Sequence, residues 1–288
     1  FEEFIPLSGD RFYGEDKSVL SGFAKFEGNP VLVIGQEKGD DLDSRIKRNF
    51  GMMRPEGYRK TIRLMKLADK FKIPIIFFID TPGAYPGVGA EERGQAEAIA
   101  KTIECSMELG VPTISVIIGE GGSGGAVALS SSSKVLMLSN AIYSVISPEG
   151  CATILWRDPT KTLEAAKAMK LSAKDLLNLG IIDEIITEPL GGAHRDRDFT
   201  LENIKNSILN NLNQLKNLNE HEIINHRKNK FLSIGRSDGF IKQSSNENSL
   251  SMKTNFLDDI KKITLIFKKE LTIFGLLIFI FSIFYFLL

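Results

Sequence analysis

Cysteine, histidine and tryptophan are scarce in this chain of 288 residues, which contains two, three and one of them. Cys105 and Cys151 are too few for a disulfide framework or a zinc site built from protein thiolates, so we expect reduced, buried thiols. A surplus of charge is also absent, because 36 Lys and Arg residues balance 36 Asp and Glu residues. This balance argues against a general electrostatic affinity for nucleic acid.

No basic and apolar leader opens the chain, and we therefore predict no signal peptide. Residues 271–288 contain no charged side chain, and a run of 18 such residues is just long enough to span a bilayer. This tail is expected to be either a membrane anchor or an apolar helix that docks on a partner. Residues 236–270, with their many Ser, Asn and charged side chains, are predicted to be a polar linker, which leaves 1–235 as one domain.

Apolar runs alternate with helical patterns through residues 1–235. The runs predict strands buried on both faces at 31–35, 75–80, 113–118, 135–138, 143–146 and 182–187. Apolar residues at helical spacing predict helices at 56–71 and 91–109, and a short helix is expected between Ser172 and Gly180. The helical patterns within 200–230 are expected to pack outside the sheet or against a partner.

This alternation predicts an α/β fold with parallel strands and right-handed crossovers. Sheets of this kind bind ligands at the carboxyl ends of their strands. Two glycine-rich loops follow predicted strands there, at residues 80–90 (DTPGAYPGVGA) and 119–126 (GEGGSGGA). The first is longer than an ordinary crossover loop, and its small, stiff residues suit a flat ligand.

The second loop fits several motifs at once. Gly119, Gly121 and Gly124 match the G-x-G-x-x-G of dinucleotide sites, but the acidic residue expected about 20 positions later is missing. No Gly-Lys-Ser/Thr follows, which excludes a P-loop. Ser123 also lies in a G-x-S-x-G pattern, with His194 or a lysine as the base, and this predicts as an alternative a membrane-tethered serine peptidase.

A third interpretation of residues 119–126 needs no reactive side chain. Glycines at a strand-to-helix turn let backbone amides face a cavity, and the helix dipole adds positive potential there. Such amides stabilise an oxyanion. A tight turn that needs small residues only for packing is the structural alternative, and the pattern of glycines alone does not separate the two.

Several segments, in order, closely resemble the alpha subunit of the bacterial and plastid acetyl-coenzyme A carboxylase carboxyltransferase family. The likeness runs over 1–235 and is carried by residues 78–100, 119–126, 143–156 and 188–196. It implies a crotonase-like spiral of ββα units with flanking helices. The helical segment that precedes the position of Phe1 in the family is missing here, and residues 236–288 are not part of the family pattern.

The resemblance implies that a carboxyl group moves from carboxybiotin, on a biotinyl carrier protein loaded by biotin carboxylase, to acetyl-coenzyme A. The product is malonyl-coenzyme A for fatty-acid biosynthesis, made in the cytoplasm or plastid stroma. The family works as an α2β2 assembly whose beta subunit holds the zinc and the enolate-stabilising hole, so no metal is expected in this chain. A non-enzymatic scaffold that recruits the biotin carrier to a membrane is a further alternative.

The resemblance also implies roles for individual residues. The backbone amides expected to form the biotin-side oxyanion hole are those of Gly124, Gly125 and Ala126. The residues expected to line or shape the biotin pocket are Gly83, Ala84, Gly121 and Gly122. Ser123 would be a small spacer, and a bulky residue at position 125 is expected to abolish transfer with the fold nearly intact.

Positive charge is concentrated in one segment, since ten Lys and Arg residues face two acidic residues between positions 45 and 72. Such a surplus could attract coenzyme A phosphates, an acidic carrier or nucleic acid. It could equally be a solvated helix face that is balanced elsewhere in the fold. Few aromatic residues lie among these charges, which argues against stacking on a single-stranded nucleic acid.

Overall fold

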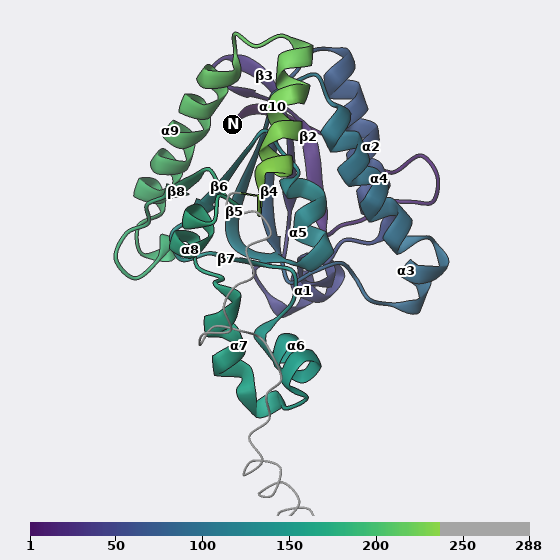
Figure 1. Cartoon of the computed structure of the whole chain (residues 1–288). Helices are drawn as coiled ribbons and strands as arrows, with labels where there is room; N and C mark the ends of the chain where they lie inside the picture. Colours follow the sequence, from purple (N-terminus) through teal and green to yellow (C-terminus); the bar gives the residue numbers. More distant parts are fainter. Residues whose placement is uncertain (237–288) are drawn as a thin grey trace, which may run out of the picture.

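The computed structural model describes residues 1–236, in which an eight-stranded sheet is flanked by helices (Figure 1). The sheet order is β1-β2-β3-β4-β5-β6-β8, and β7 pairs with the far end of β5. The strands from β3 onward run parallel, as predicted. They are β3 (Asn29–Gln36), β4 (Ile75–Thr81), β5 (Thr113–Gly122), β6 (Lys134–Leu138), β7 (Ile142–Ser144) and β8 (Glu184–Ile186).

The prediction of parallel strands alone is wrong at one edge, where β1 (Glu2–Pro6) and β2 (Val19–Phe26) add an antiparallel pair. β2 and β3 form a hairpin in which Phe26 pairs with Asn29. Both residues of the turn have positive φ, 48° at Glu27 and 73° at Gly28, as a type I′ turn requires. These strands gave no continuous apolar run, because every residue of β1 is exposed and Ser21, Gly22 and Lys25 interrupt the apolar residues of β2.

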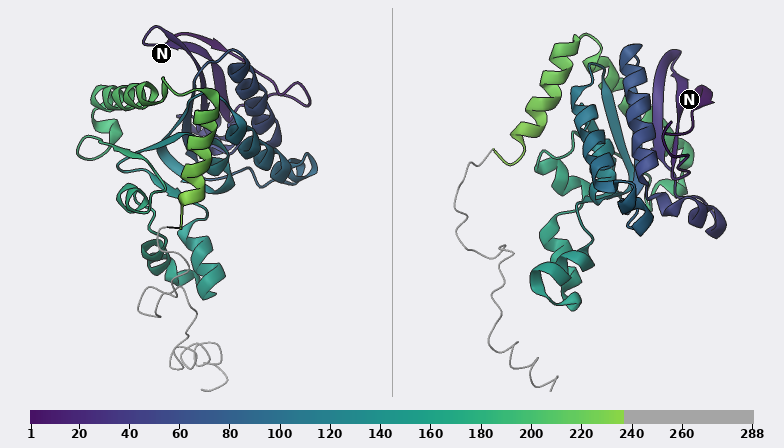
Figure 2. Two further views of the ribbon diagram at one scale, coloured as in Figure 1. Left: turned by 45° about the horizontal axis from the view of Figure 1, so that its top comes forward. Right: turned by 90° about the vertical axis from the view of Figure 1, so that its right-hand side faces the viewer.

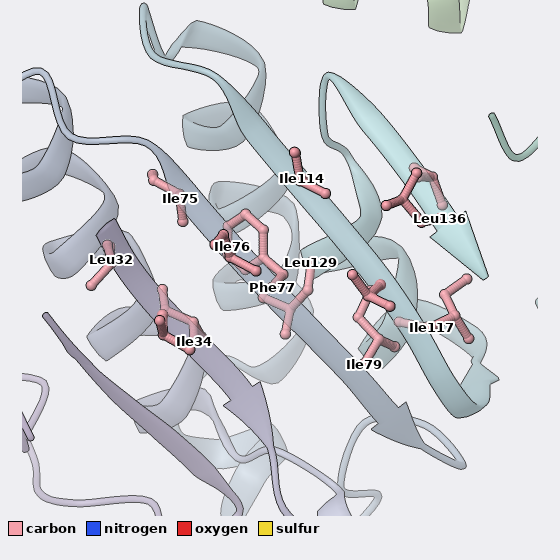
Figure 3. Close-up of a cluster of buried hydrophobic side chains, with 14 of the residues drawn as sticks. Leu32, Ile34, Ile75, Ile76, Phe77, Ile79, Ile114, Ile117, Leu129 and Leu136 are labelled. Atoms are coloured by element: carbon pink, nitrogen blue, oxygen red, sulfur yellow. The ribbon is translucent and has the colours of Figure 1, made fainter. Parts of the chain in front are cut away.

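Three helices cover one face of the sheet: α2 (Pro55–Lys70), α4 (Gln95–Glu108) and α5 (Ser123–Ser130). On the other face, α9 (Arg197–Leu215) packs against β5 and β8 (Figures 1 and 2). The core between the strands and these three helices contains fully buried side chains such as Ile34, Ile79 and Leu129 (Figure 3). Each such side chain stabilises the fold by about 1.5–3 kcal/mol.

The helix predicted at 56–71 is confirmed as α2, with Pro55 at its first position. The single helix predicted at 91–109 is instead divided into α3 (Val88–Glu92) and α4, because Gly94 adopts a left-handed conformation with a φ of 79°. The short helix α8 (Ala173–Asn178) begins as expected, since the Ser172 side chain accepts the Asp175 N–H. Three further short helices are α1 (Leu42–Lys47), η1 (Asn49–Gly51) and η4 (Ala193–Arg195).

A helical lobe at residues 146–170 projects from the sheet (Figure 1). It contains α6 (Pro148–Cys151), the π-helical turn η2 (Ala152–Trp156), η3 (Pro159–Lys161) and α7 (Thr162–Met169). A small core of Cys151, Ala152 and Ala165 is separate from the main core. Sequence patterns did not predict this lobe, because its short helices have little apolar periodicity.

No helix within residues 1–236 combines the length and the apolar character needed to cross a bilayer. The apolar tail predicted at 271–288 lies outside the described residues, and so does the linker predicted at 236–270, apart from Arg236. Those two predictions therefore stay predictions.

Much of the basic segment is balanced by the loop that joins β1 to β2. Arg59 pairs with Asp10 at 2.8 Å, and Arg63 donates to the backbone carbonyls of Ser8 and Gly9. Lys60 is 1% exposed and donates to the carbonyl of Val19 at 2.8 Å. These three residues are balanced within the fold, as one interpretation expected, but the expectation of a solvated helix face is wrong for the buried Lys60.

The C-terminal helix α10 (Glu220–Ser233) is fastened to the domain by a buried arginine. Arg227 is completely buried and donates to the carbonyls of Ser106, Leu109 and Val111 and to the Ser133 hydroxyl, at 2.8–3.0 Å. Burial lowers the pKa of its guanidinium to about 10. The guanidinium is therefore held by neutral acceptors at the amino-terminal edge of the parallel strands.

We expect Arg227→Met to lower the free energy of unfolding by about 3 kcal/mol, because the substitution leaves buried carbonyls without a donor. Urea unfolding monitored by circular dichroism measures this change. Lys228→Met, at an exposed neighbouring position of α10, is the matched control and should have little effect. Equal stability of the two variants would contradict the fastening role of Arg227.

Candidate functional site

The two glycine-rich loops meet where β4 and β5 end. Thr81 lies opposite Gly121 in the ladder between these strands, so the loop 80–90 and the turn 119–126 leave the sheet side by side. A Cβ atom on Gly122 would overlap the carbonyl oxygen of Pro82. One on Gly125 would lie 2.6 Å from the carbonyl carbon of Gly83. The loops therefore touch through their main chains.

Packing accounts for most glycines of the turn. Besides Gly122 and Gly125, Gly119 would place a Cβ 2.6 Å from the Asp80 carboxylate, and Gly121 would place one 2.9 Å from the Tyr143 ring. Gly124 differs, because its Cβ would meet only the Ile99 side chain at 3.7 Å. Packing does not require a glycine at position 124.

The expectation that a bulky residue at position 125 leaves the fold nearly intact is wrong. Its Cβ would press on main-chain atoms of both Gly83 and Ala84, at 2.6 and 2.9 Å. Main chain cannot rotate away as a side chain can, so the loop 80–90 would have to move.

The backbone amides of Gly124 and Gly125 lie in the first turn of α5. α5 starts at Ser123, and the first amides of a helix have no acceptor within it. Apart from bonds within α5 itself, no hydrogen bond among residues 1–236 uses the N–H of Gly124 or Gly125. The third predicted donor, Ala126, is completely buried and occupies the fourth helical position, where an amide first reaches the carbonyl of the N-cap.

The loop 80–90 is held rigidly beside these amides. The Thr81 hydroxyl donates to the Gly83 carbonyl at 2.7 Å and accepts the Gly83 N–H at 3.1 Å. The buried Gln95 amide donates to the carbonyls of Met53 and Tyr85, at 2.9 and 3.0 Å. The Arg54 guanidinium lies 4.4 Å above the centre of the Tyr85 ring. Gly83 and Ala84, predicted to line the pocket, are thus part of a loop with fixed geometry.

Ser123 lacks the surroundings of a nucleophile. Its φ of 50° is unusual for a residue with a side chain, but no hydrogen bond within residues 1–236 involves its hydroxyl. His194 lies in η4, which packs beside α9, and does not bond to Ser123. The serine peptidase alternative therefore finds no base in the described part of the chain.

Sequence reasoning missed a polar network that ties three strand ends together. Gln36, at the end of β3, accepts the Asp80 N–H at 3.2 Å and donates to the Gly125 carbonyl at 3.0 Å. Lys38 binds the carboxylates of Asp80, at 2.8 Å, and Glu120. Burial opposes the charge on Lys38, but these two carboxylates raise the pKa of its ammonium above the ordinary value. The only feature of the sequence that indicated this network was the position of Lys38, Asp80 and Glu120 at or near the ends of strands.

Two other features lie apart from these loops. A cavity of about 790 Å³ between the sheet and α9 is lined by residues such as Phe26, Phe78 and Ile208, and by none from 80–90 or 119–126. Within residues 1–236, no three His, Cys, Asp or Glu side chains are grouped so that they could hold a metal ion.

The profile of one protein family, described as acetyl co-enzyme A carboxylase carboxyltransferase-like, matches residues 1–235. The acetyl-coenzyme A carboxylase carboxyl transferase subunit alpha of Pelagibacter ubique is 76% identical over 253 residues, which are 88% of this chain and 69% of that protein. The subunit of the same name from Zymomonas mobilis is 58% identical over 234 residues, or 81% of this chain and 75% of that protein.

Solved structures share the fold at low identity. A Pseudomonas malonate decarboxylase hetero-tetramer in complex with coenzyme A has a chain that matches with a TM-score of 0.61 at 15% identity, over 77% of this chain and 89% of that one. Transcarboxylase 12S matches with a TM-score of 0.60 at 19% identity. That match covers 74% of this chain, which spans only 38% of the transcarboxylase chain. The expected crotonase-like α/β fold is confirmed.

The contrast between Gly122 and Gly124 gives a direct test of the loop contact. We expect Gly122→Ala to lower the free energy of unfolding by about 2–4 kcal/mol, because its methyl group would overlap Pro82. Gly124→Ala, whose Cβ would make only an ordinary van der Waals contact with Ile99, should change stability by less than about 1 kcal/mol. Thermal unfolding of both variants measures the difference, and similar melting temperatures would show that the loops are not in contact.

Proposed function

We propose that this chain, which belongs to the acetyl-coenzyme A carboxylase carboxyltransferase family, is the alpha subunit of a transferase that moves the carboxyl group of carboxybiotin to acetyl-coenzyme A. Its product is malonyl-coenzyme A, which serves fatty-acid biosynthesis. Residues 1–235 form the carboxyltransferase domain. The family profile matches that range, and one alpha-subunit relative is 76% identical.

One observation carries the catalytic part of the proposal: the unpartnered amides of Gly124 and Gly125 at the start of α5. They would donate hydrogen bonds to the ureido oxygen of carboxybiotin as negative charge collects on it. The positive end of the helix dipole acts in the same direction. One such donor is typically worth about 2.7–4 kcal/mol of transition-state stabilisation.

The remaining residues of the turn and loop shape the site. Gly121 and Gly122 keep the approach to α5 free of side chains, and Gly83 and Ala84 present a flat, rigid wall for the biotin rings. Ala126, buried in the first turn, packs the helix onto the sheet, and its amide does not donate to the biotin oxygen. Ser123 is a spacer between the strand and the helix.

This chain supplies no strong base in the reaction. Bound carboxybiotin would supply carbon dioxide when its N–C bond breaks. Its ureido nitrogen would then accept a proton from the acetyl methyl group, and the resulting enolate of acetyl-coenzyme A would attack the carbon dioxide. The amides of Gly124 and Gly125 lower the energy of the first step only. A beta subunit would stabilise the enolate.

The proposal includes further partners and a location. An α2β2 assembly with a zinc-containing beta subunit, a biotinyl carrier protein and biotin carboxylase would complete the reaction cycle. Exposed apolar side chains around the helical lobe, among them Val145, Ile154 and Leu163, favour a protein partner at that end of the molecule. Both cysteines are free thiols, which favours the reducing cytoplasm as the location.

Replacement of a single amide by an ester tests the oxyanion hole. Glycolic acid in place of Gly124 or Gly125 deletes one N–H and adds no side chain. In a complex with the beta subunit and carboxylated carrier, we expect each replacement to lower the rate of malonyl-coenzyme A formation about 10²–10³-fold.

Lactic acid in place of Ala173, the first residue of α8, is the matched control for these esters. It also removes an amide at a helix start, and turnover should stay normal. Near-normal turnover of the esters at both 124 and 125 would exclude these amides as the donors.

The serine peptidase alternative is tested by Ser123→Ala. We expect nearly unchanged carboxyl transfer, because the hydroxyl takes no part in the proposed reaction. If the chain were a serine peptidase, the Ser123→Ala variant would lose all peptidase activity. The unsubstituted chain would then react with a fluorophosphonate probe. Covalent labelling of Ser123 by that probe would overturn the transferase assignment.

A further inference from the structure

An ammonium group bridges the two loops of the candidate site. Lys38 follows β3, Asp80 lies in β4 and is the first residue of the loop 80–90, and Glu120 lies in β5 directly before Gly121. The Lys38 ammonium binds the carboxylates of both acids, at 2.8 Å for Asp80. The side chains of Lys38 and Asp80 are only 24% and 26% exposed, so water screens this pair less than a surface pair.

The same carboxylate also holds the turn through its backbone. Asp80 accepts the N–H of Glu120 at 2.9 Å, so one carboxylate receives both the ammonium and an amide of the turn. The absent side chain of Gly119 permits this approach, since a Cβ there would lie 2.6 Å from Asp80. Lys38, Asp80 and Glu120 thus form one cross-link between the loops, which we call the ammonium bridge.

Without its cation this arrangement would be unfavourable. Asp80 and Glu120 would face each other at the edge of a site where negative charge develops, and two nearby carboxylates repel. The charged groups that act on Lys38 are these two acids, while the neighbouring Glu37 side chain accepts the Gly39 N–H instead. Removal of the Lys38 charge would therefore push the loop 80–90 away from the turn.

We infer that Lys38 is a positioning residue for carboxyl transfer: through the ammonium bridge it sets the distance between the loop 80–90 and the amides of Gly124 and Gly125. The inference rests on the proposed function. Lys38 does not touch the reacting atoms in this role. It acts because a small displacement of oriented donors has a large effect on rate.

Steady-state kinetics of the full chain in complex with the beta subunit test the inference. We expect Lys38→Met to lower kcat at least about tenfold with little change in the KM for acetyl-coenzyme A, which the proposal assigns largely to the beta subunit. Lys38→Arg, which keeps a cation able to bind both carboxylates, should restore most of kcat. Lys101→Met, which breaks an exposed pair with Glu104 on α4, is the control and should behave as the unsubstituted chain.

A double substitution separates positioning from a general loss of structure. Glu120→Gln in the Lys38→Met background removes the repulsion between the acids, so kcat should rise at least about threefold above that of Lys38→Met alone. A kcat for Lys38→Met within about twofold of the unsubstituted complex, or additive effects of the two substitutions, would overturn the inference. An unsubstituted complex that makes no malonyl-coenzyme A would instead overturn the proposed function.

Discussion

Main-chain atoms of two loops lie in direct contact at the carboxyl edge of the sheet, and the geometry of the site depends on that contact. Gly122 rests on the carbonyl of Pro82, and Gly125 rests on Gly83 and Ala84. Side chains at these glycines would separate the loops by about the width of a methyl group. The unpartnered amides of α5 are consequently placed beside a wall of backbone rather than beside mobile side chains.

Polar side chains then fix this contact in one arrangement. Gln36 joins the end of β4 to the first turn of α5, while Lys38 joins Asp80 to Glu120. All of these groups come from neighbouring parallel strands, whose carboxyl ends must emerge at the same edge. A rigid sheet thus supports donors that need no reorganisation when charge develops, which is the physical basis of oxyanion stabilisation.

The glycine pattern of the turn has two physical causes that the letters alone could not separate. Gly119, Gly121, Gly122 and Gly125 are required by close packing against Asp80, Tyr143, Pro82 and Gly83. Gly124 is not, and its amide and that of Gly125 lie in the first turn of α5, where the helix supplies no acceptor. The tight-turn and oxyanion interpretations are therefore compatible. Close packing of the other glycines positions the first turn of α5, and the amides of that turn are the proposed donors.

Sequence alone determined the parallel strands, the two loops at their ends and the family, because buried strands need continuous apolar runs and the loops need particular small residues. Only the tertiary structure decided which amides lack partners, that Ala126 is buried and that Lys38 bridges Asp80 and Glu120. These facts depend on contacts between residues about 40 to 80 positions apart, and local periodicity carries no information about such contacts. The strands β1 and β2 and the helical lobe were missed because an exposed strand, a strand interrupted by polar residues and short helices leave no continuous apolar signal.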